Sequence, residues 1–153
     1  MAAYSSALYA SNTPPNTGHG FNTSSVHMHA TVSVPATLAL NDTLNFGYLP
    51  ANAVVVSVIL KAATQIESGA TLALSLGVTG TPLLFKSSVI TVGRAAGASV
   101  DTTVAAAGLL FKVPATGKVA VIGTVSTAAA AAIAGTLEVD IEFYVEDAVG
   151  SPA

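Results

Sequence analysis

In residues 136–147, TLEVDIEFYVED, apolar and more polar side chains alternate from Thr136 to Glu146. Successive side chains of a β-strand point to opposite faces, so this alternation predicts a strand with one buried and one exposed face. The residues expected in the core are Leu137, Val139, Ile141, Phe143 and Val145. The residues expected outside are Glu138, Asp140, Glu142, Tyr144 and Glu146.

A second alternating stretch, VHMHATVSV, occupies residues 26–34. Its apolar side chains stand at the even positions and its polar side chains at the odd ones. Pro35 follows it and ends the pattern, because proline has no backbone N–H to donate to a sheet. The stretch therefore predicts a second half-buried strand.

Further strand-like segments lie between these two stretches. VVVSVILKA (54–62) is almost continuously apolar and predicts a central strand, and Leu44, Phe46 and Tyr48 alternate on one face of another. STAAAAAIAG (126–135) is rich in alanine but too short for a stable helix, and predicts a loop with at most one helical turn. VDTTVAAAGLLFKV (100–113) fits either two short strands or a strand and a loop.

Together these patterns predict about eight strands, separated by turn residues and recurring every 8–12 residues or so. Strands do not alternate with long helical patterns, which argues against an α/β fold. The expected fold is all-β, either an antiparallel β-sandwich or a barrel.

The first 25 residues differ in composition, being dominated by Ser, Thr, Asn, Gly and Pro. The chain thus divides into an extended N-terminal arm (1–25), a β-sandwich domain (26–147) and a short C-terminal tail (148–153). A purely polar arm would be disordered, but this one carries four large apolar or aromatic side chains. We expect these to anchor the arm on a partner; they are Tyr4, Leu8, Tyr9 and Phe21.

Charged residues make up only 8% of the chain, against about 25% in typical soluble domains. Much of the surface is therefore expected to contact other protein, although a bland Ser/Thr/Ala surface also fits. The net charge is −3 and the five cations are scattered, which argues against nucleic acid as a partner. No apolar run reaches the ~18 residues of a membrane span, so no membrane partner is expected. No basic N-terminal signal segment is expected either, since the first cation is Lys61.

All three histidines lie near the N-terminus. His27 and His29 are two residues apart and would share a strand face, as in metal-binding jelly-roll cupins. The next carboxylate is distant, and His19 would have to fold back to become a third ligand. We therefore expect no metal and interpret the pair as polar residues on the first strand of the sandwich, near an interface. A pH-sensitive contact is a further interpretation.

The acidic row of Glu138, Asp140 and Glu142 could bind Ca²⁺ or act in acid–base chemistry. The more common alternatives are a solvated strand face or a charged sheet edge that prevents mispairing. Neither a G-x-S-x-G elbow nor a phosphate-binding loop is present. The sequence predicts neither an enzyme nor a cofactor, and the absence of cysteine excludes disulfides and thiolate metal sites.

Three segments carry a resemblance to a known family: LNDTLNFGYLPANAVVVSVILKA (40–62), TLALSLGV (71–78) and GTLEVDIEFYVED (135–147). In the pattern of side chains and the order of strands, residues 37–147 resemble the capsid decoration, or cement, proteins of tailed bacteriophages. The resemblance implies an antiparallel β-sandwich of the jelly-roll type. It also implies a structural protein on the outer surface of the virion, grouped as a homotrimer and bound to the major capsid protein. It brings no site residue with it, and the arm lies outside it.

Two other functions stay open at this point. One is a phage tail or connector component, including a receptor-binding, carbohydrate-binding module. Sugar sites use exposed aromatic side chains, and the chain has only nine aromatic residues and no tryptophan, so the support for this function is weak. The other is a metal-dependent, cupin-like enzyme that would use the histidine pair.

Overall fold

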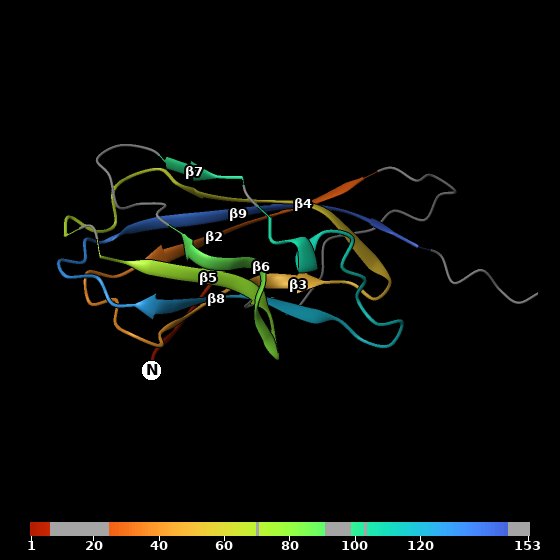
Figure 1. Cartoon of the computed structure of the whole chain (residues 1–153), viewed down its shortest axis with the longest axis horizontal. Coiled ribbons are helices and arrows are strands. Elements are labelled where there is room, and N and C mark those ends of the chain that lie inside the picture. The colour runs from red at the N-terminus through yellow and green to blue at the C-terminus, as the bar shows by residue number, and fades with distance from the viewer. Residues whose placement is uncertain (7–24, 70, 91–98, 103, 147–153) are drawn as a thin grey trace, which may run out of the picture.

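The computed structural model describes residues 1–6, 25–69, 71–90, 99–102 and 104–146 (Figure 1). Nine strands and one turn of 3₁₀ helix lie in these ranges. The elements are β1 (Ala3–Ser5), β2 (Val26–Val34), β3 (Thr43–Leu49), β4 (Ala53–Ala62), β5 (Ala73–Val78), β6 (Thr81–Ile90), β7 (Ser99–Asp101), η1 (Ala106–Gly108), β8 (Val119–Thr127) and β9 (Gly135–Val145).

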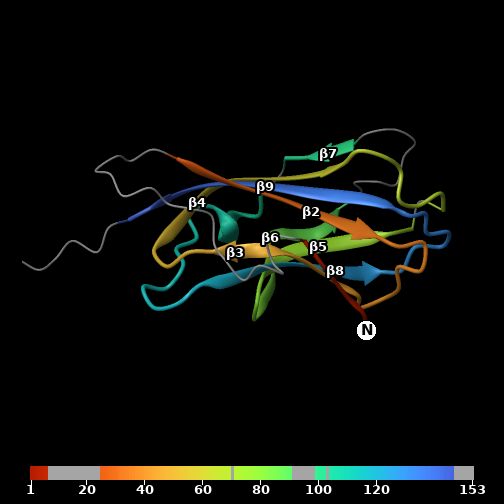
Figure 2. The same cartoon turned by 180° about the vertical axis from the view of Figure 1, so that it is seen from behind.

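The strands form two sheets packed face to face. One has the order β2-β9-β4-β7 and the other β1-β3-β8-β5-β6 (Figures 1 and 2). Numbered from one to eight, the strands β2 to β9 lie in the orders 1-8-3-6 and 2-7-4-5, which is the arrangement of a jelly roll. The predicted all-β sandwich is confirmed, and all pairs of these eight strands are antiparallel. The added β1 is the exception, because it pairs with β3 in parallel.

The strand predicted from residues 136–147 is β9, and it lies inside its sheet between β2 and β4. Its alternation holds as predicted, with four of the five expected core residues fully buried and Val145 half-buried. β2 alternates in the same way, and it pairs with β9 along nine consecutive residues without a shift. The alternating patterns of β2 and β9 therefore fix how the two strands pair. A shift of one strand by a single residue would turn its apolar side chains from the core to solvent.

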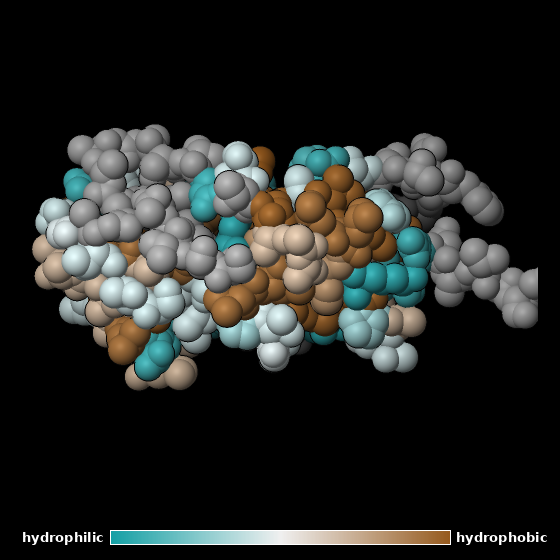
Figure 3. Space-filling model, in the orientation of Figure 1, coloured by the Kyte–Doolittle hydropathy of each residue, from teal (hydrophilic) through white to brown (hydrophobic). Residues whose placement is uncertain are grey.

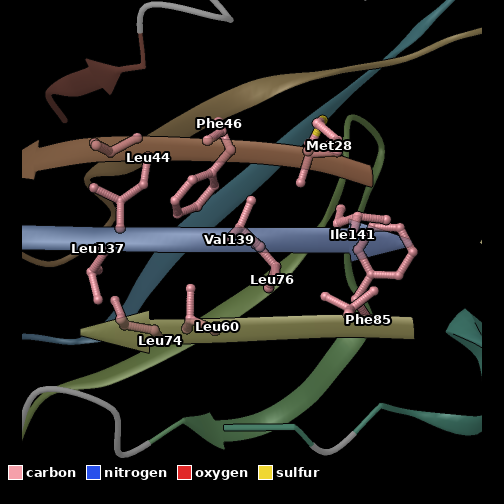
Figure 4. Close-up of a cluster of buried hydrophobic side chains, with 14 of the residues drawn as sticks. Met28, Leu44, Phe46, Leu60, Leu74, Leu76, Phe85, Leu137, Val139 and Ile141 are labelled. Atoms are coloured by element: carbon pink, nitrogen blue, oxygen red, sulfur yellow. The ribbon is translucent and has the colours of Figure 1, made fainter. Parts of the chain in front are cut away.

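The core fills the space between the two sheets (Figure 4). One sheet contributes side chains from β2, β4 and β9, and the other from β3, β5 and β6, and burial of each large side chain contributes about 1.5–3 kcal/mol. The labelled core residues are Met28, Leu44, Phe46, Leu60, Leu74, Leu76, Phe85, Leu137, Val139 and Ile141.

A β-bulge in β3 corrects one detail of the prediction. The register of β3 on β8 shifts between Asn45 and Gly47, so the alternation that begins with Leu44 and Phe46 does not continue to Tyr48. Leu49 is fully buried instead, and Tyr48 is half-buried with the Lys118 ammonium 4.4 Å from its ring centre. The extra residue of a bulge reverses the faces that follow it.

The two ambiguous segments both become mainly loop. Residues 128–134 form a loop with a single bridge between Ala132 and Glu67 and contain no helical turn. The tertiary contacts of the loop outweigh the helix propensity of its alanines. Residues 99–102 and 104–113 form the short β7, η1 and a loop, which corresponds to the strand-and-loop alternative.

Residues 1–6 do not behave as a free arm, because β1 is an integral strand of the five-stranded sheet. The predicted boundary at residue 25 stays a prediction, although β1 belongs to the sheet. Residues 7–24 and 147–153 lie outside the described residues, so the rest of the predicted arm and the tail stay predictions.

Candidate interaction surfaces

The outer face of the four-stranded sheet carries the histidines and the acidic row side by side. In the β2–β9 register, His27 stands opposite Glu142 and His29 opposite Asp140. The His29 Nδ1 lies 2.5 Å from the Asp140 Oδ1. The predicted polar face of β2 is thus confirmed, since its histidines, Thr31 and Ser33 are all exposed.

Asp140 is the centre of this polar face. Lys61, on β4, donates to its second carboxylate oxygen. Partial burial alone would raise the pKa of Asp140, but the hydrogen bonds from Lys61 and then His29 outweigh it and hold this pKa below its usual value. The bond to Asp140 in turn raises the pKa of Lys61. One acid of the row is therefore neutralised within the chain.

The position of β9 decides between the alternatives for the acidic row. β9 is an interior strand, so Glu138, Asp140 and Glu142 do not protect a sheet edge. They form a half-exposed face, in which Ser57 also lies 3.4 Å from a Glu142 oxygen. Within the described residues, no three His, Cys, Asp or Glu side chains come together in a group that could hold a metal ion.

Of the four predicted anchors, the structure describes only Tyr4. It lies in β1, half-buried against the core of its own chain, and its hydroxyl is 3.3 Å from the Asp42 Oδ2. Ser6 is buried and donates to the Phe46 carbonyl. Leu8, Tyr9 and Phe21 lie outside the described residues, so their partner contacts stay predictions.

A patch of exposed apolar side chains lies on the opposite side of the sandwich from β2. Figure 3 shows brown surface gathered around η1 and the adjoining parts of β4 and β6. We call it the leucine patch, and its members are Val56, Leu83, Leu109 and Leu110, which are 38%, 50%, 50% and 67% exposed. Exposed apolar side chains that gather in this way mark interaction surfaces more often than single ones do.

The loop that carries the patch is held firmly. The Leu110 N–H donates to the Val55 carbonyl at 2.9 Å, and the Val55 N–H donates to the Phe111 carbonyl at 3.0 Å. The loop thereby continues the sheet along the part of β4 that β7 does not reach. Gly108 is required beneath it, since a Cβ there would stand 2.4 Å from the Leu84 carbonyl oxygen.

Leu110 has a φ of 57°, a conformation that costs a residue with a Cβ about 1–2 kcal/mol. Its side chain is the most exposed of the patch. Burial of this side chain within its own chain therefore does not offset the strain of the backbone. The sequence analysis overlooked this patch. Its only local signal was a pair of adjacent leucines in a loop of small residues.

Two solved structures share the fold. A chain of the structure titled "Cyanophage Pam1 capsid asymmetric unit" matches with a TM-score of 0.70 and 26% identity, over 90% of this chain and 96% of that one. A chain of "Capsid of Ralstonia phage GP4" matches with a TM-score of 0.70 and 22% identity, over 99% and 100% of the two chains. The second likeness shows the shared fold, and the first supports a phage capsid-related, virion structural protein.

No protein-family model matches the chain. No curated protein matches it either. Among the described residues, the structure has no helix with the length and hydropathy to cross a membrane.

Proposed function

We propose that this chain is a capsid decoration protein, which binds the outer surface of the major capsid shell and stabilises it. The observation that carries the proposal is the likeness to a chain of the Pam1 capsid along nearly the whole length of both chains. A protein with 8% charged residues also suits a surface that is largely covered by neighbours. The role is structural and involves no catalysis.

Two parts of the chain are proposed to contact the shell. The leucine patch offers apolar side chains on a rigid loop, and buried anchors of this kind contribute on the order of 1–3 kcal/mol each. Leu8, Tyr9 and Phe21 would extend the contact to a neighbouring subunit, which multiplies the avidity of each copy. Grouping as a homotrimer on the shell belongs to the same proposal.

The test is to add the purified protein to shells assembled without it. Binding is measured by co-sedimentation, and stabilisation by the temperature at which the shells open. We expect saturable binding and a higher opening temperature. Failure of the folded protein to bind shells of its own phage at micromolar concentration would contradict the proposal.

Variants then separate the two contacts. Leu109→Ser with Leu110→Ser is expected to weaken binding at least tenfold, whereas Leu40→Ser is the matched control, since Leu40 is 52% exposed on the loop between β2 and β3. Leu8→Ser, Tyr9→Ser and Phe21→Ser together test the arm. Unchanged affinity in either set would remove that contact from the proposal.

The alternative proposal is a tail or connector component, including a carbohydrate-binding receptor module. The copy number of this chain in purified particles distinguishes the two. A number comparable to that of the major capsid protein supports decoration, and a handful of copies per particle supports the alternative.

A further inference from the structure

The edge of β2, which pairs with no other strand among the described residues, differs from the other sheet edges of this fold. A sheet edge presents unpaired N–H and C=O groups, and monomeric proteins protect it with short strands, bulges, prolines or charges. β1 and β7 are only three residues long, and β6 contains Pro82, Lys86 and two register shifts. Three of the four edges are thus protected in known ways.

β2 has none of these protections. It is nine residues long, pairs with β9 without a shift and contains no proline, glycine, lysine or acid. Among the described residues, its backbone hydrogen bonds run to β9 alone. Figure 2 shows β2 at the front of its sheet, with β9 and β4 behind it. The edge is a long, flat template for one more strand.

We propose that this edge pairs with β2 of a second copy of the chain, in antiparallel orientation about a two-fold axis through Ala30. Of the registers that keep like faces together, only this one overlaps all nine residues. It places His27 opposite the second copy's Ser33 and His29 opposite its Thr31, so each imidazole meets a hydroxyl. On the inner face it sets apolar residues opposite apolar residues.

The residue types of β2 agree with this pairing. β2 contains no lysine, arginine, aspartate or glutamate, and a register centred on His29 would instead set two imidazoles against each other. The acidic rows on β9 of the two copies would lie three strand spacings apart, roughly 14 Å. That exceeds the Debye length of about 8 Å at physiological salt, so the rows hardly repel. The contact is isologous and separate from the three-fold grouping proposed above, so it would link neighbouring groups.

Disulfide trapping tests the register, because the chain has no cysteine of its own. Residues directly opposite in an antiparallel pair have Cα atoms about 4.5–5.5 Å apart, within reach of a disulfide. His29→Cys with Thr31→Cys is expected to give a covalent dimer under mild oxidation. His27→Cys with Thr31→Cys is the matched control, since its cysteines align only in the register centred on His29.

Sedimentation velocity tests the contact without a trap. Ser33→Lys places a charge on the edge strand, while Thr136→Lys places it directly opposite on interior β9. We expect the first to weaken two-fold association at least tenfold and the second to leave it unchanged. Equal trapping in both cysteine variants, or association that Ser33→Lys does not weaken, would overturn the proposal. So would a chain that shows no two-fold species at millimolar concentration, even if it binds shells.

Discussion

The Asp42 Oδ1 accepts a hydrogen bond of 2.7 Å from the backbone N–H of Ala2, forty residues earlier in the chain. The other oxygen of Asp42 accepts from the Ala39 N–H at 2.9 Å. One buried carboxylate thus ties β1 to the turn that begins β3. The Ala2 and Ala39 N–H groups hold the pKa of Asp42 below its usual value.

Asp42→Asn is expected to release β1. The asparagine amide has only one oxygen that can accept, and its NH₂ group would face one of the two backbone N–H donors. We therefore expect the free energy of unfolding to fall by about 1–3 kcal/mol. Hydrogen exchange should show faster exchange at residues 2–6, with the interior strand β9 still protected. Glu146→Gln is the control, since Glu146 is in an exposed pair with Lys112. Unchanged protection at residues 2–6 in Asp42→Asn would contradict this role.

Glu67→Gln is expected to destabilise the whole domain. The Glu67 carboxylate is fully buried and accepts from the N–H and hydroxyl of Thr71 and the N–H groups of Leu72 and Ala130. It therefore joins the loop before β5 to the loop before β9. We expect a cost on the order of 3 kcal/mol in urea unfolding, because several N–H donors lose a charged acceptor.

Asp140→Asn provides the comparison for Glu67→Gln. It also removes a carboxylate bound by several donors, but its partner His29 is exposed and the site is open to water. Exposed ion pairs contribute at most about 1 kcal/mol, so the loss should be smaller than for Glu67→Gln. Equal losses from the two variants would show that burial does not decide the effect.

The stability of the domain is expected to fall in acid. Burial alone would raise the pKa of Glu67, but its hydrogen bonds from Thr71, Leu72 and Ala130 outweigh burial and lower it. Together with Asp42 and Asp140, it has a pKa that is lower in the folded state than in the unfolded one. Their stabilisation is complete above the unfolded values of about 4 and is lost as the pH falls through the folded values. Urea unfolding between pH 7 and pH 2 should show this loss, with a shallower slope for Glu67→Gln.

Asp101→Asn is expected to cost about 3–5 kcal/mol, because it leaves the Lys86 ammonium buried without its counter-charge. The Lys86 side chain is 2% exposed, and its Nζ lies 3.1 Å from the Asp101 Oδ1. Burial lowers the pKa of Lys86 and the ion pair opposes that shift. Adding Lys86→Met should recover most of the loss in a double-mutant cycle. A double variant no more stable than Asp101→Asn would show that the unpaired charge is not the cause.

Leu110→Gly is expected to stabilise the fold by up to about 1 kcal/mol, because glycine adopts its φ of 57° without strain. Leu109→Gly is the matched neighbour, since Leu109 has a φ of −70° and glycine there only adds unfolded-state entropy. Opposite signs in thermal unfolding would confirm that Leu110 is strained. Weaker shell binding by the more stable Leu110→Gly would support a role of the leucine patch in contact with the shell.

The sequence by itself determined which residues form the core strands. The period-two pattern of β2 and β9 is a local property of the pleated backbone, so Met28, Val139 and Phe143 could be assigned to the interior without a structure. The all-β class followed from the number and spacing of such patterns.

Only the tertiary structure decided what lies beside what. Pairing between residues 40 or more apart has no local signal, so the bonds from Asp42 to Ala2 and from His29 to Asp140 could not be predicted. The place of β1 in the sheet, the bulge that turns Tyr48 away from the core and the interior position of β9 depend on strand neighbours. The exposed leucine patch and the position of β2 at an edge of the described sheet appeared for the same reason. Exposure depends on which strands cover a residue, and that is settled only when the sheets assemble.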